Sequence, residues 1–295
     1  MSADTNIAGE ERIGGFRFVR TIHPGATSVV LEVVQESTGK RFAMKQLLAS
    51  RGDDPAERKA FHFEAKLGMQ LRHPNLVRVH EYFRDPVQPY FLMDLFPSYH
   101  LKLPIARPSV YPMPVRQLHR IIEQAAGGLA YMHEQGWVHR DVKPENILAN
   151  KSGEVKVIDF ALAMRPFSGL KKLLKSKAPR QGTPSYMAPE QIRCESPSPS
   201  ADIYSFGITC YELTCGRPPF RANSTSELLN KHLSERAIAP TTHNKDITPE
   251  FSELVLKLLQ KRPADRLADL REFLSRFARV RIYKDDPEPQ ASRGY

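Results

Sequence analysis

Apolar positions near the N-terminus follow the pattern of an antiparallel sheet. Three runs rich in β-branched and aromatic residues, FRFVRTI, VVLEVVQ and RFAMKQL, lie within residues 16–47, and the turn sequence ESTG precedes the third. The stretch AERKAFHFEAKLGMQL follows Asp54-Pro55, a helix-start signal, and has apolar residues at three- and four-residue spacing. Two more strand-like runs, NLVRVHEYF and YFLMDLF, end near Phe96. This part is expected to be a small antiparallel sheet with one main helix.

From Pro114 onward the apolar positions recur with the period of helices. The helical patterns are VRQLHRIIEQAAGGLAYMHEQG, DIYSFGITCYELTCG, SELLNKHLS, PEFSELVLKLLQ and LADLREFLSRFARV. The expected fold class is therefore α+β, with an N-lobe at 16–94, a hinge at 94–100 and a larger, mostly helical C-lobe at 101–282. An N-terminal extension (1–15) and a disordered tail (283–295) are expected to flank this domain.

The composition is that of an ordinary globular chain, and it also bears on the cellular compartment in which the protein is expected. Of 295 residues, 41% are apolar and 26% are charged. No apolar run approaches the roughly 18 residues of a membrane span, and the N-terminus lacks the layout of a signal peptide. Three cysteines show no metal-binding spacing. These features favour a cytoplasmic protein with reduced thiols.

The charge balance favours anionic partners without choosing among them. Lys plus Arg number 43 against 33 for Asp plus Glu, so the net charge is 43 − 33 = +10. Nucleotides, acidic proteins and phospholipid headgroups would all be attracted. A nucleic-acid binder is a further alternative, but no aromatic-interleaved basic surface or reading helix is apparent, so no specific nucleic acid is expected.

The stretch HRDVKPENILANKSGEVKVIDF, residues 139–160, contains the strongest candidates for catalytic and metal-binding residues. Its two short strand-like runs are joined by the turn NKSG, which brings Asn146 and Asp159 to the same end of a hairpin. An amide oxygen and a carboxylate suit Mg²⁺, which in turn favours phosphate oxygens. Asp141 is close enough in sequence to face a nucleophile beside that metal. Lys143 adds positive charge where phosphate charge would develop.

These residues belong to a set of motifs that resembles the eukaryotic-type (Hanks-type) protein kinases, of the serine/threonine branch. HRDVKPEN resembles the catalytic loop of that family, VIDFA the metal-binding segment, GTPSYMAPE the end of the activation segment, and FAMK the lysine-bearing strand. DIYSFG and RPADRL resemble later family segments, in which Arg266 is expected to pair with Glu190. The resemblance spans about residues 16–280 and implies a bilobal protein-kinase-like fold.

The resemblance also implies catalytic roles. Asp141 would orient and deprotonate the acceptor hydroxyl, with Lys143 beside it. Lys45 would hold the α- and β-phosphates of ATP and pair with Glu64. Lys143, together with Thr183 of GTPSY, favours Ser or Thr acceptors in a protein substrate.

Binding roles follow from the same likeness. Asn146 and Asp159 would hold Mg²⁺. The residues expected to line the nucleotide site are Gly25, Val30, Ala43, Lys45, Met93, Asp94, Phe96 and Leu148.

Three departures from the family pattern favour an alternative, a pseudokinase that acts as a nucleotide-binding or scaffolding module. The glycine-rich loop is reduced to HPGATSVV, which keeps only Gly25 and a following valine. Ala161 replaces the glycine of the metal-binding triplet. Gly68 stands where relatives place an apolar side chain in a stacked column, so a cavity is expected unless Met69 or another neighbour fills it. The presence of the five expected catalytic and metal-binding side chains favours the enzyme.

The loop at 165–180 is strongly basic, with six positive residues and no acidic one. Its leucines at 170, 173 and 174 are spaced as in a short amphipathic helix, which could form a lid or dock an acidic partner or a membrane surface. A solvated loop is the equal alternative. Ser168 and Ser176 are candidate phosphorylation sites, and Arg140 is the residue that would meet such a phosphate. The oligomeric state is left open.

Overall fold

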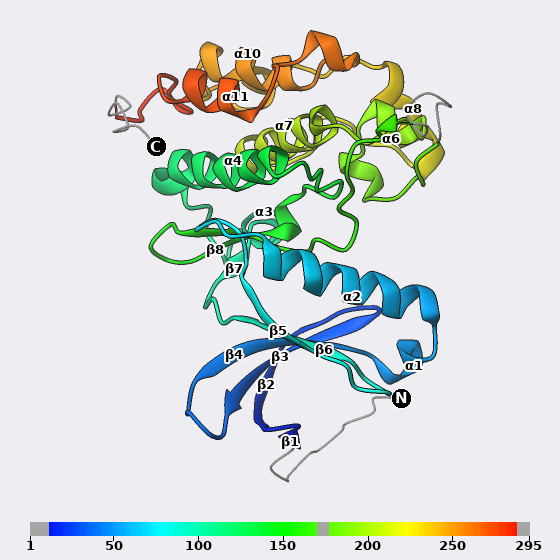
Figure 1. The fold of residues 1–295 in the computed structure, drawn as a ribbon. Helices are drawn as coiled ribbons and strands as arrows, with labels where there is room; N and C mark the ends of the chain where they lie inside the picture. The colour runs from blue at the N-terminus through cyan, green and yellow to red at the C-terminus, as the bar shows by residue number, and fades with distance from the viewer. Residues whose placement is uncertain (1–11, 170–176, 288–295) are drawn as a thin grey trace. The chain divides into compact units, whose positions relative to one another are not determined.

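The protein was analysed as a computed structural model that describes residues 12–169 and 177–287. These residues form two compact units (Figure 1). The first contains residues 12–72 and 77–97, and the second contains 73–76 and the described residues from 98 onward. Each unit has its own core and is described separately below.

The first unit is a six-stranded antiparallel sheet with the strand order β1-β2-β3-β4-β6-β5. The strands are β1 (Arg12–Ile13), β2 (Phe16–Pro24), β3 (Ser28–Gln35), β4 (Arg41–Leu47), β5 (Val79–Phe83) and β6 (Tyr90–Asp94). The predicted strands and their antiparallel pairing are confirmed. Strand β1, which pairs with β2, extends the sheet into residues expected to be an N-terminal extension.

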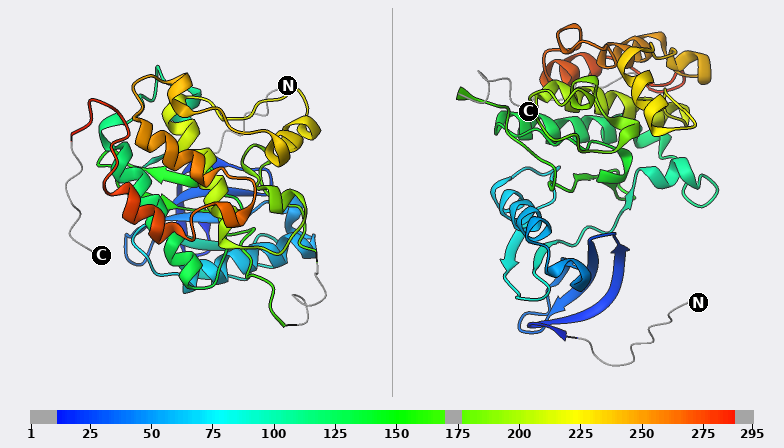
Figure 2. Two further views of the ribbon diagram at one scale, coloured as in Figure 1. Left: turned by 90° about the horizontal axis from the view of Figure 1, so that it is seen from above. Right: turned by 90° about the vertical axis from the view of Figure 1, so that its right-hand side faces the viewer.

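The two helices of this unit are α1 (Ala49–Gly52) and α2 (Pro55–Gln70). Helix α2 begins where predicted, because the Asp54 side chain accepts hydrogen bonds from the backbone N–H groups of Ala56 (2.8 Å) and Glu57 (3.4 Å). It packs beside the sheet (Figures 1 and 2), where Phe61 and Ala65 are buried with sheet residues including Phe91. A second apolar cluster consists of buried side chains from strands β2, β3, β4 and β6.

The second unit is built around α7 (Pro199–Cys215), whose residues 201–214 are all buried. Helices α4 (Leu118–Glu134), α10 (Pro249–Leu258) and α11 (Leu270–Phe277) stack in layers with it (Figures 1 and 2). Smaller helices are α3 (Lys102–Ala106), α6 (Pro189–Ile192), α8 (Thr225–Ser234) and α9 (Pro240–His243). A small sheet of β7 (Tyr99–His100), β8 (Ile147–Ala149) and β9 (Val155–Val157) completes the unit.

Residues 73–76 belong to the helical unit, although the sequence places them between α2 and β5. The Asn75 carbonyl accepts a hydrogen bond from Val157 N (2.8 Å), and its amide donates to Gln124 Oε1 (2.9 Å). The His73 ring stacks on Tyr131 at 5.1 Å. The N-lobe expected at 16–94 is therefore interrupted at residues 73–76, because the contacts of these residues are made with the helical unit.

The expected start of a disordered tail at residue 283 is wrong. Tyr283 forms a β-bridge with Ile247, and Lys284 N donates to Asp246 O (2.9 Å). Burial raises the pKa of the Tyr283 phenol. These contacts hold residues 283–286 against the segment before α10.

Across residues 12–169 and 177–287, no helix is both long and apolar enough to span a membrane.

Candidate active site

The loop that contains Asp141 is held in place by a buried carboxylate from α7. Asp202 accepts hydrogen bonds from the backbone N–H groups of His139 (2.7 Å) and Arg140 (2.8 Å), and from His133 Nε2 (2.8 Å). Burial alone would raise the pKa of Asp202, but the bond and charge of His133 hold that pKa below its ordinary value. Arg140 has a φ of 70°, a left-handed conformation that costs energy outside glycine. The hydrogen bonds from His139 N and Arg140 N to Asp202 stabilise this conformation.

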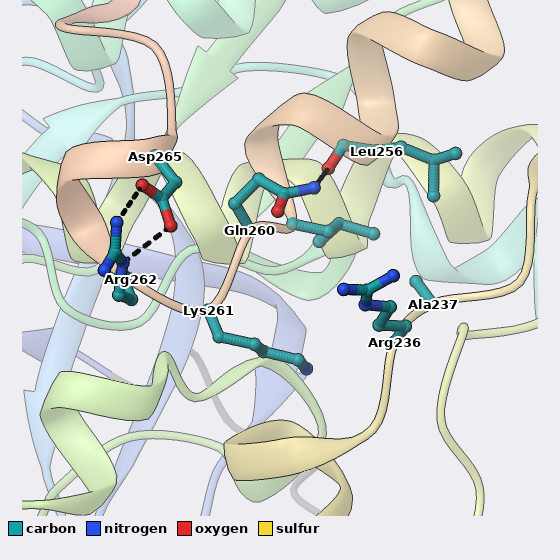
Figure 3. Close-up of a pocket in the computed structure, with 8 residues that line it drawn as sticks. Arg236, Ala237, Leu256, Gln260, Lys261, Arg262 and Asp265 are labelled. Atoms are coloured by element: carbon teal, nitrogen blue, oxygen red, sulfur yellow. Dashed lines mark hydrogen bonds and ion pairs between the residues drawn. The ribbon is translucent and has the colours of Figure 1, made fainter.

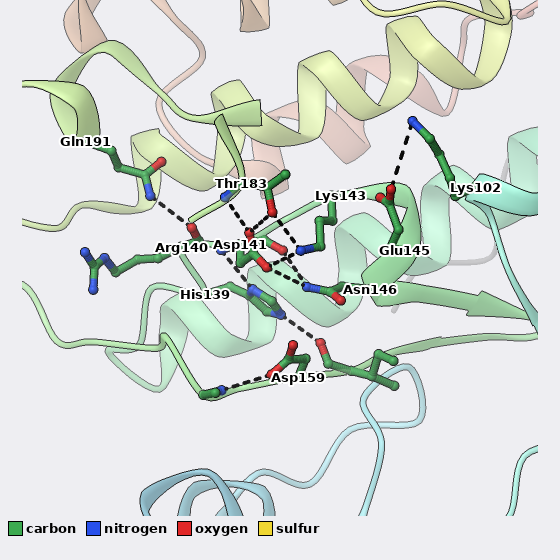
Figure 4. Close-up of polar contacts among 12 residues, drawn as sticks. Lys102, His139, Arg140, Asp141, Lys143, Glu145, Asn146, Asp159, Thr183 and Gln191 are labelled. Carbon is green, nitrogen blue, oxygen red and sulfur yellow. Dashed lines mark hydrogen bonds and ion pairs between the residues drawn. The ribbon is translucent and has the colours of Figure 1, made fainter. Parts of the chain in front are cut away.

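Asp141 is surrounded by hydrogen-bond donors within the helical unit (Figure 4). Its Oδ1 accepts from the backbone N–H (3.0 Å) and hydroxyl (2.8 Å) of Thr183, and its Oδ2 accepts from Lys143 Nζ (2.6 Å) and Asn146 Nδ2 (3.1 Å). Lys143 Nζ also donates to Thr183 Oγ1 (2.7 Å). Because every donor contacts the carboxylate directly, these hydrogen bonds fix its position.

The hairpin brings Asn146 and Asp159 to the same end, as the sequence predicted. The turn Pro144–Asn146 leads into β8, and Ile158 N, next to Asp159, donates to Asn146 O (3.0 Å). The Asn146 amide nitrogen donates twice to Asp141, to the backbone O (2.9 Å) and to Oδ2, so the amide oxygen faces away from Asp141. An amide oxygen and a carboxylate are the donors that Mg²⁺ prefers, so these two residues fit that ion.

The segment Asp159–Ala161 accommodates alanine in this conformation. The left-handed backbone falls at Asp159, with a φ of 68°, and Ala161 has no positive φ. Ala161 N donates to Asp159 Oδ1 (3.4 Å). Phe160 is buried against the His139 ring at 6.0 Å. The substitution of glycine by alanine therefore imposes no backbone strain here.

In the first unit, Lys45 and Glu64 form a close ion pair. The Lys45 ammonium on β4 lies 2.7 and 2.8 Å from the two carboxylate oxygens of Glu64 on α2. The side chains are 16% and 7% exposed, so the pair is largely shielded from water. The sheet and the helix therefore assemble the pair that the motif spacing predicted.

Val30, Ala43, Lys45, Met93 and Asp94, five of the residues predicted to line a nucleotide site, lie on strands β3, β4 and β6 of the first sheet. Val30 is the cross-strand partner of Lys45, and Ala43 is the partner of Met93. Residue Leu148 belongs to β8 of the other unit, where it pairs with His100.

The Asp94 backbone N–H donates to Arg78 O (3.1 Å) within the first unit, so this amide is already engaged. Its side chain bonds His80 Nε2 at 2.7 Å, a partner that the sequence analysis missed. Phe96 follows two residues later, after β6 has ended.

The space around Gly25 leaves no room for a larger side chain. A side chain at this position would place Cβ 2.6 Å from Ser28 O, the same carbonyl that accepts from Gly25 N at 2.9 Å. The remaining glycine of the reduced loop therefore closes a tight turn, and its backbone N–H is engaged in the hydrogen bond to Ser28 O.

Gly68 lies on the buried side of α2, and the neighbouring Met69 packs against the cluster that contains Val79. Whether Met69 or another neighbour fills the space left at Gly68 stays a prediction.

The predicted pair of Arg266 and Glu190 is present and buried. The guanidinium lies 2.6 and 2.9 Å from the carboxylate oxygens, and the side chains are 0% and 3% exposed. Arg266 also donates to the carbonyls of Ser200 (2.7 Å) and Gln260 (2.8 Å). This pair ties the short helix α6 to the segment after α10.

The predicted amphipathic helix in the basic loop, and Ser176, lie at residues 170–176, outside the described part of the chain. On either side of them, the loop contacts the helical unit. The Arg165 guanidinium lies 4.5 Å from the Trp137 ring centroid, and Phe167 N donates to Ser196 Oγ (3.0 Å). Arg140 donates to the carbonyls of Pro179 (2.6 Å) and Leu162 (3.3 Å).

Two supporting residues were not singled out from sequence. Asp202 lies in DIYSFG, a motif that was noticed but not connected to the loop at 139–146, and His133 carried no signal of its own. Only the fold brings them together with His139.

The loop, the hairpin and the ion pairs define the class of protein. The chain matches the protein kinase domain over residues 16–276, and it therefore belongs to the protein kinase family. The predicted family and bilobal fold class are confirmed.

Three bacterial relatives are similar over most of the chain. Serine/threonine-protein kinase PknA of Mycobacterium tuberculosis is 32% identical over 281 residues, 94% of this chain and 63% of the relative. PknL of Mycobacterium bovis is 33% identical over 248 residues, 84% of this chain and 61% of that protein. PknB of Mycolicibacterium smegmatis is 33% identical over 243 residues, 81% of this chain and 38% of that protein. The chain thus spans less than two thirds of the length of these relatives.

Proposed function

We propose that the protein is a serine/threonine protein kinase that transfers the γ-phosphoryl group of ATP to hydroxyl groups of a protein substrate. The observation that carries this proposal is the network around Asp141, in which Thr183, Lys143 and Asn146 supply four donors to one carboxylate. The names of the similar bacterial proteins agree with Ser and Thr as acceptors.

Asp141 would accept the proton of the attacking hydroxyl. Its carboxylate is held in one orientation by four donors, which would position it beside the substrate hydroxyl. Lys143 lies 2.6 Å from Asp141, and its ammonium would stabilise negative charge that develops on the transferred group.

The nucleotide contacts are proposed from the family likeness and fit the donor chemistry. Asn146 and Asp159 would hold Mg²⁺, which when bound neutralises phosphate charge. Lys45, oriented by Glu64, would hold the α- and β-phosphates. Gly25, Val30, Ala43, Met93, Asp94, Phe96 and Leu148 would contact the rest of the nucleotide. The cytoplasmic location and an acidic or membrane partner at 165–180 stay predictions.

A phosphoryl-transfer assay tests the proposal against the pseudokinase alternative. Radiolabelled ATP with Mg²⁺ and a generic protein acceptor would be incubated with the wild type, Asp141→Asn and Lys45→Met. Incorporation on Ser and Thr by the wild type alone supports the enzyme. Nucleotide binding by the wild type with no incorporation above that of Asp141→Asn would support the pseudokinase.

A further inference from the structure

A pocket in the helical unit lies among residues that the proposed chemistry does not use (Figure 3). It has a volume of about 330 Å³. The loop between α8 and α9 supplies Arg236 and Ala237, and the end of α10 with the following segment supplies Leu256, Leu259, Gln260, Lys261, Arg262 and Asp265. The space is large enough for about two side chains of a bound peptide.

The pocket has an apolar floor and a cationic rim. Ala237, Leu256 and Leu259 provide the apolar surface, and the neighbouring Ile238 is 48% exposed. Ile238 follows the lining residue Ala237 in the sequence and adds an exposed apolar side chain in the same loop.

Two of the three cations on the rim are already engaged. Lys261 Nζ donates to the carbonyls of His232 (2.9 Å) and Lys231 (3.3 Å) at the C-terminal end of α8, and lies 4.2 Å from the Phe220 ring centroid. Arg262 makes two bonds of 2.8 Å to Asp265. Lys261 is therefore held by neutral acceptors and Arg262 by a carboxylate, both within the unit.

Arg236 is the cation left to meet a ligand. Among the residues that the structure describes, it has no hydrogen bond or ion pair, and Figure 3 shows its side chain extending from the loop toward Leu256 on α10 and Gln260 just after this helix. A single available guanidinium favours a single carboxylate. A multiply charged group would also meet the Asp265 carboxylate and the carbonyl end of α10, both of which repel it.

We propose that this pocket is a docking site for a peptide segment of a protein partner in which an acidic residue adjoins apolar residues. The carboxylate would pair with Arg236, and an apolar neighbour would cover Leu256 and Ala237. The site is separate from Asp141, so it would contribute affinity for a partner and not phosphoryl transfer.

Amide NMR titration of the isotope-labelled full chain tests the site with three probes. These are the peptide Gly-Leu-Glu-Leu-Gly, the matched peptide with Gln in place of Glu, and sodium phosphate. The proposal expects saturable shifts at residues 236–238 and 256–265 with the Glu peptide, and affinity about fivefold lower with the Gln peptide. Arg236→Gln should cause a similar loss, whereas Arg279→Gln, at an exposed arginine elsewhere in the unit, should not.

The result that would overturn the proposal is absence of saturable shifts at these amides, equal binding of the two peptides, or unchanged binding by Arg236→Gln. Saturation of the same amides by phosphate at lower concentration than by the Glu peptide would instead assign the pocket to phosphate. The same titration with Asp141→Asn should be unchanged, so the outcome is independent of the proposed kinase activity.

Discussion

Thr183 offers a direct test of how Asp141 is positioned. Its hydroxyl donates to Asp141 Oδ1 at 2.8 Å and accepts from Lys143 Nζ at 2.7 Å, so one oxygen connects the proposed base to the neighbouring cation. Thr183→Val keeps the shape and the backbone N–H but removes both of these bonds. Thr183→Ser keeps the hydroxyl and removes only a methyl group.

The magnitude follows from the kind of hydrogen bond that is lost. A bond to a charged group contributes about 1.5–3 kcal/mol. If that energy positions the carboxylate in the transition state, kcat should fall roughly 10- to 150-fold in Thr183→Val. Three donors to Asp141 remain, from Thr183 N, Lys143 and Asn146, so the loss should be smaller than in Asp141→Asn.

Steady-state phosphorylation of a Ser-containing acceptor, with ATP varied, measures this effect. KM for ATP should change little in Thr183→Val, because the lost bonds do not involve the proposed nucleotide residues, and Thr183→Ser should retain most of the wild-type kcat. Wild-type kcat in Thr183→Val would refute the reasoning. Equal losses in the Ser and Val variants would show that any change in the side chain at position 183 lowers kcat, and would contradict a specific role of the hydroxyl.

Three further predictions concern other parts of the chain. Glu64→Gln should lower kcat/KM for ATP roughly tenfold or more by weakening the hold on Lys45, whereas Glu81→Gln, at an exposed glutamate, should be neutral; equal activities would contradict the role of the pair. Glu190→Gln should cost about 3–5 kcal/mol in urea unfolding because it leaves the buried Arg266 charge uncompensated, and a cost below about 1 kcal/mol would be inconsistent with this. Burial and the charge of Lys261 lower the pKa of His232 from 6.5 to about 3 in the folded protein. Between pH 6.5 and pH 3 this histidine therefore binds a proton in the unfolded state but not in the folded state, so the free energy of unfolding should fall as the pH falls. From pH 6.5 to 5 this loss is roughly 2 kcal/mol, and His232→Phe should show a flatter pH profile by the same unfolding assay.

The elements with strong local signals could be predicted from the sequence. The strands from Phe16 to Leu47 and the start of α2 at Asp54 follow from short-range patterns, and the structure confirms them. The shorter strands β1 and β7 were missed because two residues carry too little periodicity to be recognised. The folded position of Tyr283 was missed because it depends on pairing with Ile247, far away in the sequence.

The sequence by itself determined the family and the chemical types of the site residues, because motifs such as HRDVKPEN are local and their order is preserved along the chain. Only the tertiary structure decided what holds those residues in place. Asp202 reaches the loop from a position 62 residues beyond Arg140, and Thr183 reaches Asp141 across 42 residues. Such contacts depend on the packing of whole helices, which no short stretch of sequence encodes.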